Sequence, residues 1–305
     1  MADLDQLRVF VAVAEAGGFA PAARLLRVSP PAVTRAIAGL ERHLGARLLH
    51  RTTRMVRLTE VGERFVQDAR RILGELAEAE ASARGAHIEP QGELAITAPV
   101  MFGRLHVAPT LLAFLAEHPK VQARVMFVDR VVHLMEEGFD VAVRIASLPD
   151  SSFTAARLGT VRRVVVASPD YLARHGAPAS PAELPQHQGV GFGGSGGSFT
   201  RWTFAAPDDR VVRETAQPQM PLRLNSVDVA IEAALAGHGL ARVLSYQVRD
   251  HVAAGRLRYV LQPFEPPPVP VHLVYPEGRK AAAKVRAFID FAAARLRGHP
   301  ALNEA

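Results

Sequence analysis

The residues with the most telling chemistry lie at the start of one predicted helix. Hydroxyl and guanidinium groups placed there can reach base edges and phosphate oxygens in the major groove of DNA. The exposed face of this helix start carries Ser29, Pro30, Pro31, Thr34 and Arg35. A predicted β-hairpin follows, with groups suited to the DNA backbone or the minor groove: Arg51, Thr52 and Arg54. The sequence therefore predicts a surface that binds double-stranded DNA.

Apolar spacing predicts the elements that hold these side chains. Ser29 can cap the reading helix through its hydroxyl, Pro30 suits its first position, and Gly45 ends it. Its buried face is predicted to contain Val33, Ile37, Leu40 and Leu44. The preceding helix has a small apolar face made of Ala22, Ala23 and Leu26. A helix, a tight turn, a helix and a basic hairpin are typical of a winged helix-turn-helix; the alternative is a helical hairpin with solvated arginines.

A long helix is predicted after the hairpin. Thr59 can cap it, and Glu60 and Glu63 suit its positive N-terminal end. Its apolar residues have the spacing of a coiled-coil seam: Phe65, Ala69, Ile72, Leu76, Ala79 and Ala83. The seam packs either on its own domain or on the same helix of a second subunit. We favour pairing between subunits, because a palindromic operator needs two readers.

Strands alternate with helices from residue 92 onward, which predicts an α/β domain with a mostly parallel sheet and helices on both faces. The predicted strands are 94–97, 121–128, 140–145, 162–167, 257–261 and 269–275. The predicted helices are 105–118, 131–137, 169–175, 226–236 and about 280–297. The chain is expected to cross between two lobes near 163–168 and again near the proline-rich segment 262–269. Two crossings predict two lobes around a cleft.

The cleft is predicted to bind a small anion. Ligands of open parallel sheets bind beyond the carboxyl ends of the strands, where one strand leads to a helix through Thr97, Ala98, Pro99 and Val100. Asn225 and Ser226 lie at the start of another helix. Two helix N-termini that converge on one cleft favour a negative ligand, and Arg144 could add a full charge. Alternatively, Thr97 and Ser226 cap their helices and Arg144 forms an internal ion pair.

Residues 1–60 resemble the winged helix-turn-helix of LysR-type transcriptional regulators, and the resemblance extends over the whole chain. The matching segments are Leu7–Phe10, Gly17–Phe19, Ala22–Leu25, Val28–Pro30, Ala32–Ile37, Leu40–Glu41, Leu44–Gly45, Leu48–Leu49, Arg51–Thr52 and Leu58–Gly62. One departure is Pro31, where the family usually has a small or polar residue. The resemblance implies an N-terminal all-α winged helix-turn-helix over 1–60 and a dimerising linker helix over 61–88. It further implies a two-lobed, periplasmic-binding-protein-like (type 2) effector domain over 92–305, with lobe I near 92–164 and 267–298 and lobe II near 165–266.

The resemblance also implies a function. Such a protein regulates transcription in the cytoplasm as a homodimer or homotetramer, binds promoter DNA, responds to a small effector and works with RNA polymerase. In the family, segments that match Phe127, Ile145 and the cleft residues above line the effector pocket. No catalytic residue, metal or cofactor is expected.

Composition limits the alternatives. The chain has 305 residues, a net charge of +6 and a pI of about 10.2, which favours a polyanionic partner. It has no cysteine, no signal-peptide pattern at its start and no apolar run near the roughly 20 residues of a membrane span. A periplasmic-type solute-binding protein is the main alternative, and it should lack the reader. A hydrolase built on Gly193, Ser195 and Gly197 matches G-x-S-x-G, but the context predicts a loop.

Overall fold

The computed structural model describes residues 3–51, 56–83, 89–147, 153–193, 201–206, 212–276 and 282–303. The chain divides into two compact units, residues 1–88 and residues 89–305. Each unit has its own buried apolar cluster, so each is stabilised by a separate core.

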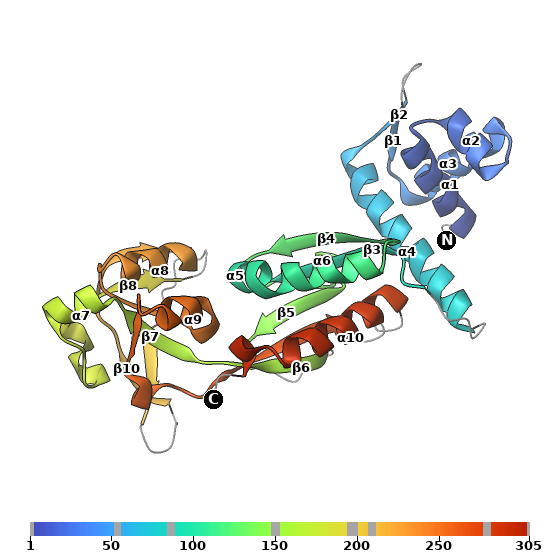
Figure 1. Ribbon diagram of the computed structural model, residues 1–305. Coiled ribbons are helices and arrows are strands. Elements are labelled where there is room, and N and C mark those ends of the chain that lie inside the picture. Colours follow the sequence, from blue (N-terminus) through green and yellow to red (C-terminus); the bar gives the residue numbers. More distant parts are fainter. Residues whose placement is uncertain are drawn as a thin grey trace. The chain divides into compact units, whose positions relative to one another are not determined.

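The N-terminal unit is a winged helix-turn-helix followed by a long helix, as predicted (Figure 1). Its elements are α1 (Leu4–Ala16), α2 (Phe19–Leu26), α3 (Pro30–Leu44), β1 (Leu49–Arg51), β2 (Val56–Leu58) and α4 (Glu60–Ala83). β1 and β2 pair antiparallel to form the wing. The core of the unit lies between α1, α2 and α3, where Phe10, Val33 and Ile37 are fully buried.

The turn between α2 and α3 has the predicted length, but two local predictions are wrong. Arg27 adopts the left-handed conformation (φ 54°) and ends α2, with its N–H donating to the Arg24 carbonyl. Ser29 is the N-cap residue of α3, yet its hydroxyl makes no capping bond. Leu44 is exposed and lies outside the core, because α3 ends there at the left-handed cap Gly45.

In the part of the chain that the structure describes, the second unit contains two five-stranded sheets, ordered β4-β3-β5-β14-β6 and β11-β8-β12-β7-β13, and an antiparallel pair of strands, β9 and β10. The strands are β3 (Gly92–Ala98), β4 (Val121–Phe127), β5 (Val141–Ile145), β6 (Phe153–Val161), β7 (Arg163–Ala167), β8 (Gln188–Phe192), β9 (Trp202–Ala205), β10 (Val212–Ala216), β11 (Gln219–Leu224), β12 (Leu240–Leu244), β13 (Arg258–Val260) and β14 (Val269–Pro276). Each sheet belongs to one lobe, which confirms the two-lobed α/β architecture.

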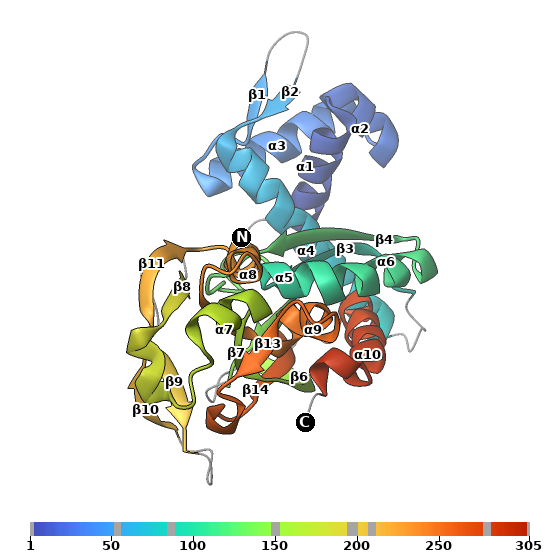
Figure 2. The same cartoon turned by 60° about the vertical axis from the view of Figure 1, so that its left-hand side comes forward.

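The helices of this unit pack on both sheets. They are α5 (Val100–Phe102), the π-turn η1 (Gly103–Val107), α6 (Ala108–Glu117), α7 (Pro169–His175), η2 (Pro181–Gln186), α8 (Val227–Leu235), α9 (Ser245–Ala253), η3 (Gln262–Phe264), α10 (Ala283–Arg297) and η5 (Pro300–Leu302). α6 and α10 pack against each other beside the first sheet (Figure 1), whereas α8 and α9 pack on the second (Figure 2).

The prediction of a mostly parallel sheet holds for strand direction, because only β14 in the first sheet and β7 in the second run against the other strands. β3, β4 and β5 are parallel, and so are β8, β11 and β12, but β14 and β7 pair antiparallel with their neighbours. The reason is the double crossing between lobes. β6 leaves the first lobe and β14 returns to it, while β7 enters the second lobe and β13 leads out of it, so these strands run in opposite directions.

The first crossing occurs at Arg162, not over 163–168, because Arg163–Ala167 already forms β7 in the second sheet. The second crossing follows η3 as predicted. An ion pair ties the two crossings together: Arg162 Nη1 lies 3.0 Å and 3.2 Å from the carboxylate oxygens of Glu265. These side chains are only 17% and 13% exposed. Arg162 and Ser245 also exchange two hydrogen bonds, of 2.9 Å and 3.1 Å, so the hinge is held by several contacts.

The helical run Val100–Glu117 differs from two expectations. It begins before residue 105 and contains the π-turn η1. By length and composition alone it could span a membrane, whereas the sequence predicted no apolar run of that length. However, Phe102, Val107 and Phe114 from this run are buried in the main core of the unit, and a buried core helix can have the same length and composition.

Candidate DNA-binding surface and effector site

The predicted reading residues lie together on α3. Ser29, Pro30, Pro31, Thr34 and Arg35 are all exposed. The Thr34 hydroxyl donates to the Pro30 carbonyl at 3.1 Å, which orients its oxygen, while the Ser29 hydroxyl is not used for capping. Arg35 has no ion-pair partner in the described part of the chain. The helix start therefore presents hydroxyl and guanidinium groups to solvent.

The wing residues are only partly described. Arg51 is the last residue of β1, and its backbone pairs with Val56. The Arg51 side chain, Thr52 and Arg54 lie outside the described residues, so their contacts with DNA remain a prediction.

The wing is held against α3 and α4 by Glu41, Thr59 and Gly62. Of these, Thr59 was predicted only as a helix cap, and no role in the wing was predicted for Glu41 or Gly62. Glu41 Oε1 accepts hydrogen bonds from the backbone N–H groups of Leu48 and Leu49 at 2.9 Å and 3.2 Å. Thr59 caps α4, since its hydroxyl accepts from the Gly62 N–H at 2.9 Å and donates to the Arg47 carbonyl at 2.7 Å. A Cβ at Gly62 would collide with the Leu48 carbonyl oxygen. These contacts fix the wing beside the reading helix.

The first part of the predicted α4 seam packs on its own domain. Phe65 lies against Phe10, with ring centroids 5.7 Å apart, and Ala69 is fully buried in the core of the unit. The prediction that these two residues pair between subunits is therefore wrong. Ile72 is 37% exposed, and neither Ile72 nor Leu76 belongs to that core. The Ala79 and Ala83 side chains lie outside the described residues.

In the second unit, Thr97 and Arg144 share one face of the first sheet. Thr97 pairs with Ala142 across β3 and β5, and Arg144 follows Ala142 by two residues, so both side chains point the same way. Thr97 is only 1% exposed, and the described residues offer its hydroxyl no hydrogen-bond partner. Thr97 does not cap a helix, because β3 continues to Ala98 and the N-cap of α5 is Pro99.

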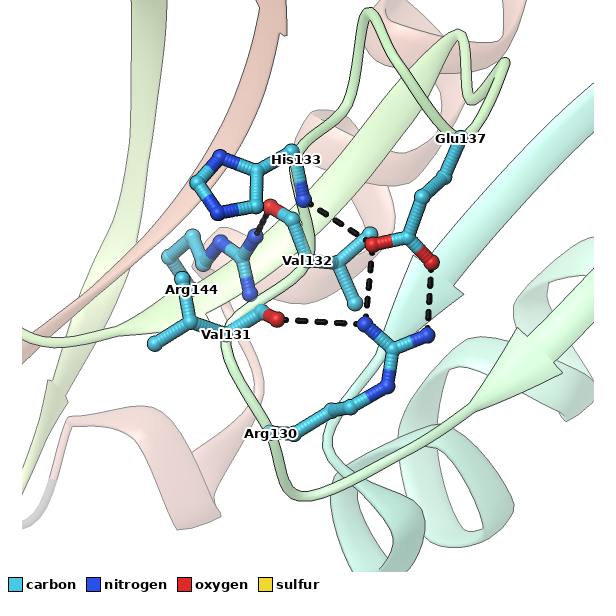
Figure 3. A network of polar contacts seen from close by, with 6 residues as sticks. All are labelled: Arg130, Val131, Val132, His133, Glu137 and Arg144. Atoms are coloured by element: carbon cyan, nitrogen blue, oxygen red, sulfur yellow. Dashed lines mark hydrogen bonds and ion pairs between the residues drawn. The ribbon is translucent and has the colours of Figure 1, made fainter.

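Arg144 contacts the loop that contains Val132 (Figure 3), and the described residues do not form the internal ion pair considered for it. Its Nη2 donates to the Val132 carbonyl at 2.5 Å, and burial lowers the pKa of its guanidinium. The loop is held by Arg130, whose two terminal nitrogens donate to Glu137 at 2.8 Å and 2.6 Å. These bonds lower the pKa of Glu137 to about 2. Residues 131–137 therefore form a turn held by the Arg130–Glu137 pair, and not the predicted helix.

Other predicted effector residues lie on the opposite face of the same sheet. Ala98, Phe127 and Ile145 all contact the main core. Gly103 packs so closely on the Phe127 ring that a Cβ there would clash. At the carboxyl ends of β3, β4 and β5, Thr97 and Arg144 therefore lie on one face of the sheet. Phe127 lies on the other face, against the start of the Val100–Glu117 run.

The starts of α5 and α8 converge, but each carries a carboxylate. Asp129 Oδ1 accepts from the Val100 N–H at 3.0 Å. Asp228, in the first turn of α8, lies 2.7 Å from Arg104 Nη2, which joins the two lobes. Burial raises the pKa of the Tyr246 hydroxyl, and the charges of Asp129 and Asp228 raise it further. The free N–H groups expected to attract an anion are therefore partly satisfied by the protein itself.

Ser226 and Asn225 precede α8 as predicted. Ser226 is the N-cap residue, but its hydroxyl makes no capping bond, and Asn225 is exposed. Arg104, Asp228 and Tyr246 could not be recognised from the sequence, because nothing in their spacing links the two lobes. Among the described residues, no group of three metal-ligating side chains is found. Ser195 and Gly197 lie outside them.

Comparison with known proteins matches both units. Residues 4–63 match the family described as bacterial regulatory helix-turn-helix protein, lysR family, and residues 87–297 match the LysR substrate binding domain. An HTH-type transcriptional regulator of Xanthomonas campestris pv. campestris (strain 8004) is 36% identical over 296 residues, or 96% of this chain and 86% of that protein.

Solved structures match over nearly the full length. CrgA, a LysR-type transcriptional regulator from Neisseria meningitidis, gives a TM-score of 0.61 at 32% identity, covering 98% of this chain and 100% of that chain. The full-length Vibrio cholerae virulence activator AphB gives a TM-score of 0.60 at 27% identity, covering 96% of this chain and 99% of that chain.

Proposed function

Because this chain belongs to the LysR family of DNA-binding transcriptional regulators, we propose that it binds operator DNA as an oligomer and that a small anion alters this binding. The observation that carries the proposal is the exposed start of α3, whose opposite face is fully buried. The proposed DNA contacts are Ser29, Pro30, Pro31, Thr34, Arg35, Arg51, Thr52 and Arg54. The DNA-binding match argues against the solute-binding alternative, and we propose no enzymatic activity.

The proposed effector site lies at the carboxyl ends of β3, β4 and β5 and at the start of α8. Its residues are Thr97, Ala98, Pro99, Val100, Phe127, Arg144, Ile145, Asn225 and Ser226. Two hydroxyls without partners, on Thr97 and Ser226, support a polar ligand. The half-buried guanidinium of Arg144, which bonds only a carbonyl in the described residues, supports a negative one. We therefore assign the charge recognition to Arg144 in preference to the helix ends.

Assembly and location complete the proposal. The α4 residues Ile72 and Leu76 lie outside the core of their own unit, which supports pairing with a second subunit in a homodimer or homotetramer. A regulator must reach chromosomal DNA, so we place the protein in the cytoplasm. The proposal extends to RNA polymerase as a partner on the family resemblance alone.

Substitution of the reading arginine tests the DNA contacts. Arg35→Ala is expected to weaken binding to the operator by about 1–3 kcal/mol, because a base or phosphate contact is lost. Arg51→Ala and Arg54→Ala should weaken binding to all DNA and reduce the salt slope by about one unit each. Retardation of a duplex from the chain's own upstream region, titrated with salt, measures both effects. Arg42→Ala, at the far end of α3, is the matched control; an equal loss there would contradict the assignment.

Removal of single hydroxyls tests the effector site. Thr97→Val and Ser226→Ala should weaken the effector response by roughly 1–3 kcal/mol, because a buried partner on the effector would remain unpaired. Operator binding without effector should stay close to that of the original protein, since the reader is a separate unit. Induction of a reporter driven by the chain's own upstream region is compared with operator retardation. Thr97→Ser, which keeps the hydroxyl, is the control, and normal induction in Thr97→Val and Ser226→Ala would place the effector elsewhere.

A further inference from the structure

Among the described residues of the second unit, two ion pairs that involve both lobes or their crossings differ in exposure. Arg162 and Glu265 meet at the hinge, where both side chains are largely buried and several other bonds surround them. Arg104 and Asp228 come from η1 and from the first turn of α8, and their side chains are 60% and 42% exposed. Exposed ion pairs contribute little to stability and are weakened by dissolved salt. The Arg104–Asp228 pair can therefore open, while the hinge pair acts as a fixed pivot.

The Arg104 backbone is held firmly in place. Arg104 lies in the π-turn η1, directly after Gly103. Gly103 packs so closely on the Phe127 ring that no side chain would fit there. Such π-turns are often found at functional sites. The guanidinium is thus presented from a fixed point at the carboxyl edge of the first sheet, next to residues of the proposed effector site.

The carboxylate of Asp228 remains stabilised when its ion pair with Arg104 opens. It lies in the first turn of α8, where the partial positive charge of the helix end stabilises a carboxylate. The same helix end carries Ser226, whose hydroxyl is not used for capping. An anion bound beside Ser226 would therefore lie close to Asp228 and would compete with it for the guanidinium of Arg104.

We propose that Arg104 is a further effector-binding residue, and that Asp228 occupies it in the effector-free protein as an internal substitute for the carboxylate of the effector. This inference rests on the proposed function, because it requires a negatively charged effector. In this inference the effector has a carboxylate, which replaces the carboxylate of Asp228 as the ion-pair partner of Arg104. The exchange removes a contact between the lobes, which gives the ligand a differential affinity for two arrangements of the lobes.

Carboxylate binding to the full-length chain tests the exchange. The probes are acetate, pyruvate, succinate and benzoate, titrated while the fluorescence of Trp202, the single tryptophan, is recorded. Asp228→Asn keeps the shape and a residue suited to a helix start, but frees Arg104. It should bind at least one of these carboxylates with a Kd about three- to tenfold lower than the unmodified chain. Asp228→Asn combined with Arg104→Gln should lose that gain.

The controls separate this inference from general charge effects and from the proposed function. Asp250→Asn removes an exposed carboxylate from α9 of the same lobe and should leave every Kd unchanged. Equal tightening in Asp250→Asn, or no tightening in Asp228→Asn, would overturn the assignment of Arg104. The reporter response of the Thr97 and Ser226 variants tests the proposed site itself, so its failure is recognised independently.

Discussion

Aspartate at both Ile72 and Leu76 is expected to separate the subunits of the DNA-bound assembly. These residues are four positions apart on one face of α4 and lie outside the core of their own unit, so the substitutions should leave that unit folded. In a subunit interface each would bury an unpaired carboxylate, which is costly. A total cost of roughly 4 kcal/mol corresponds to about a thousandfold weaker self-association. Sedimentation of the full chain measures the mass, and retardation measures the DNA stoichiometry.

The matched control keeps the added charge but moves it off the seam. Gln67 and Ala77 are exposed on the same helix, so Gln67→Asp with Ala77→Asp should leave mass and stoichiometry unchanged. If the Ile72 and Leu76 variant also keeps its mass and its DNA stoichiometry, α4 does not pair the subunits. The seam would then serve only the packing within one unit that Phe65 and Ala69 already show.

The helix-turn-helix could be predicted from sequence because its signals are local. Val33, Ile37 and Leu40 repeat with the period of one helix face, and Gly45 ends the helix in the left-handed conformation that glycine adopts readily. Pro30 occupies the first helical position as expected. Ser29 shows the limit of such rules, since its position was predicted correctly and the use of its hydroxyl was not.

The antiparallel strands β14 and β7 could not be predicted, because their places depend on contacts distant in sequence. β14 lies between β5 and β6 only because the chain returns from the second lobe. The segment 131–137 has helix-like composition, but the Arg130–Glu137 pair closes it into a turn. Composition alone does not show that a charged pair seven residues apart will meet.

The candidate effector site was predicted in part. The end of β5 at Ile145 was predicted correctly and the end of β3 one residue early, because a buried strand followed by a helix or a loop is recognisable from sequence. The carboxylates at the two helix starts were not predicted, because the Asp129 bond to the Val100 N–H and the Arg104–Asp228 pair join residues distant in sequence. The groups that favour an anion are therefore the arginines Arg104 and Arg144, and not the helix ends.

We expect His106 to make the stability of the second unit depend on pH. It lies in η1 and is 7% exposed, and its ring contacts Phe102, Tyr246 and His299. Its Nε2 is buried and has no hydrogen-bond partner in the described residues. Burial, and secondarily the charge of His299, lowers the pKa of His106 to about 4, from an ordinary value of 6.5. The folded protein therefore holds His106 neutral.

Acidification is expected to destabilise this domain between pH 6.5 and pH 4. In that window the unfolded chain binds a proton at His106 that the folded chain does not, so stability is complete above pH 6.5 and falls as the pH falls. The full loss corresponds to about 3 kcal/mol. Urea unfolding followed by the fluorescence of Trp202, which is buried in the second lobe, measures it. His106→Phe keeps an aromatic ring and should flatten the pH dependence, whereas the exposed control His238→Gln should not. An unchanged slope in His106→Phe would show that other groups cause the acid sensitivity.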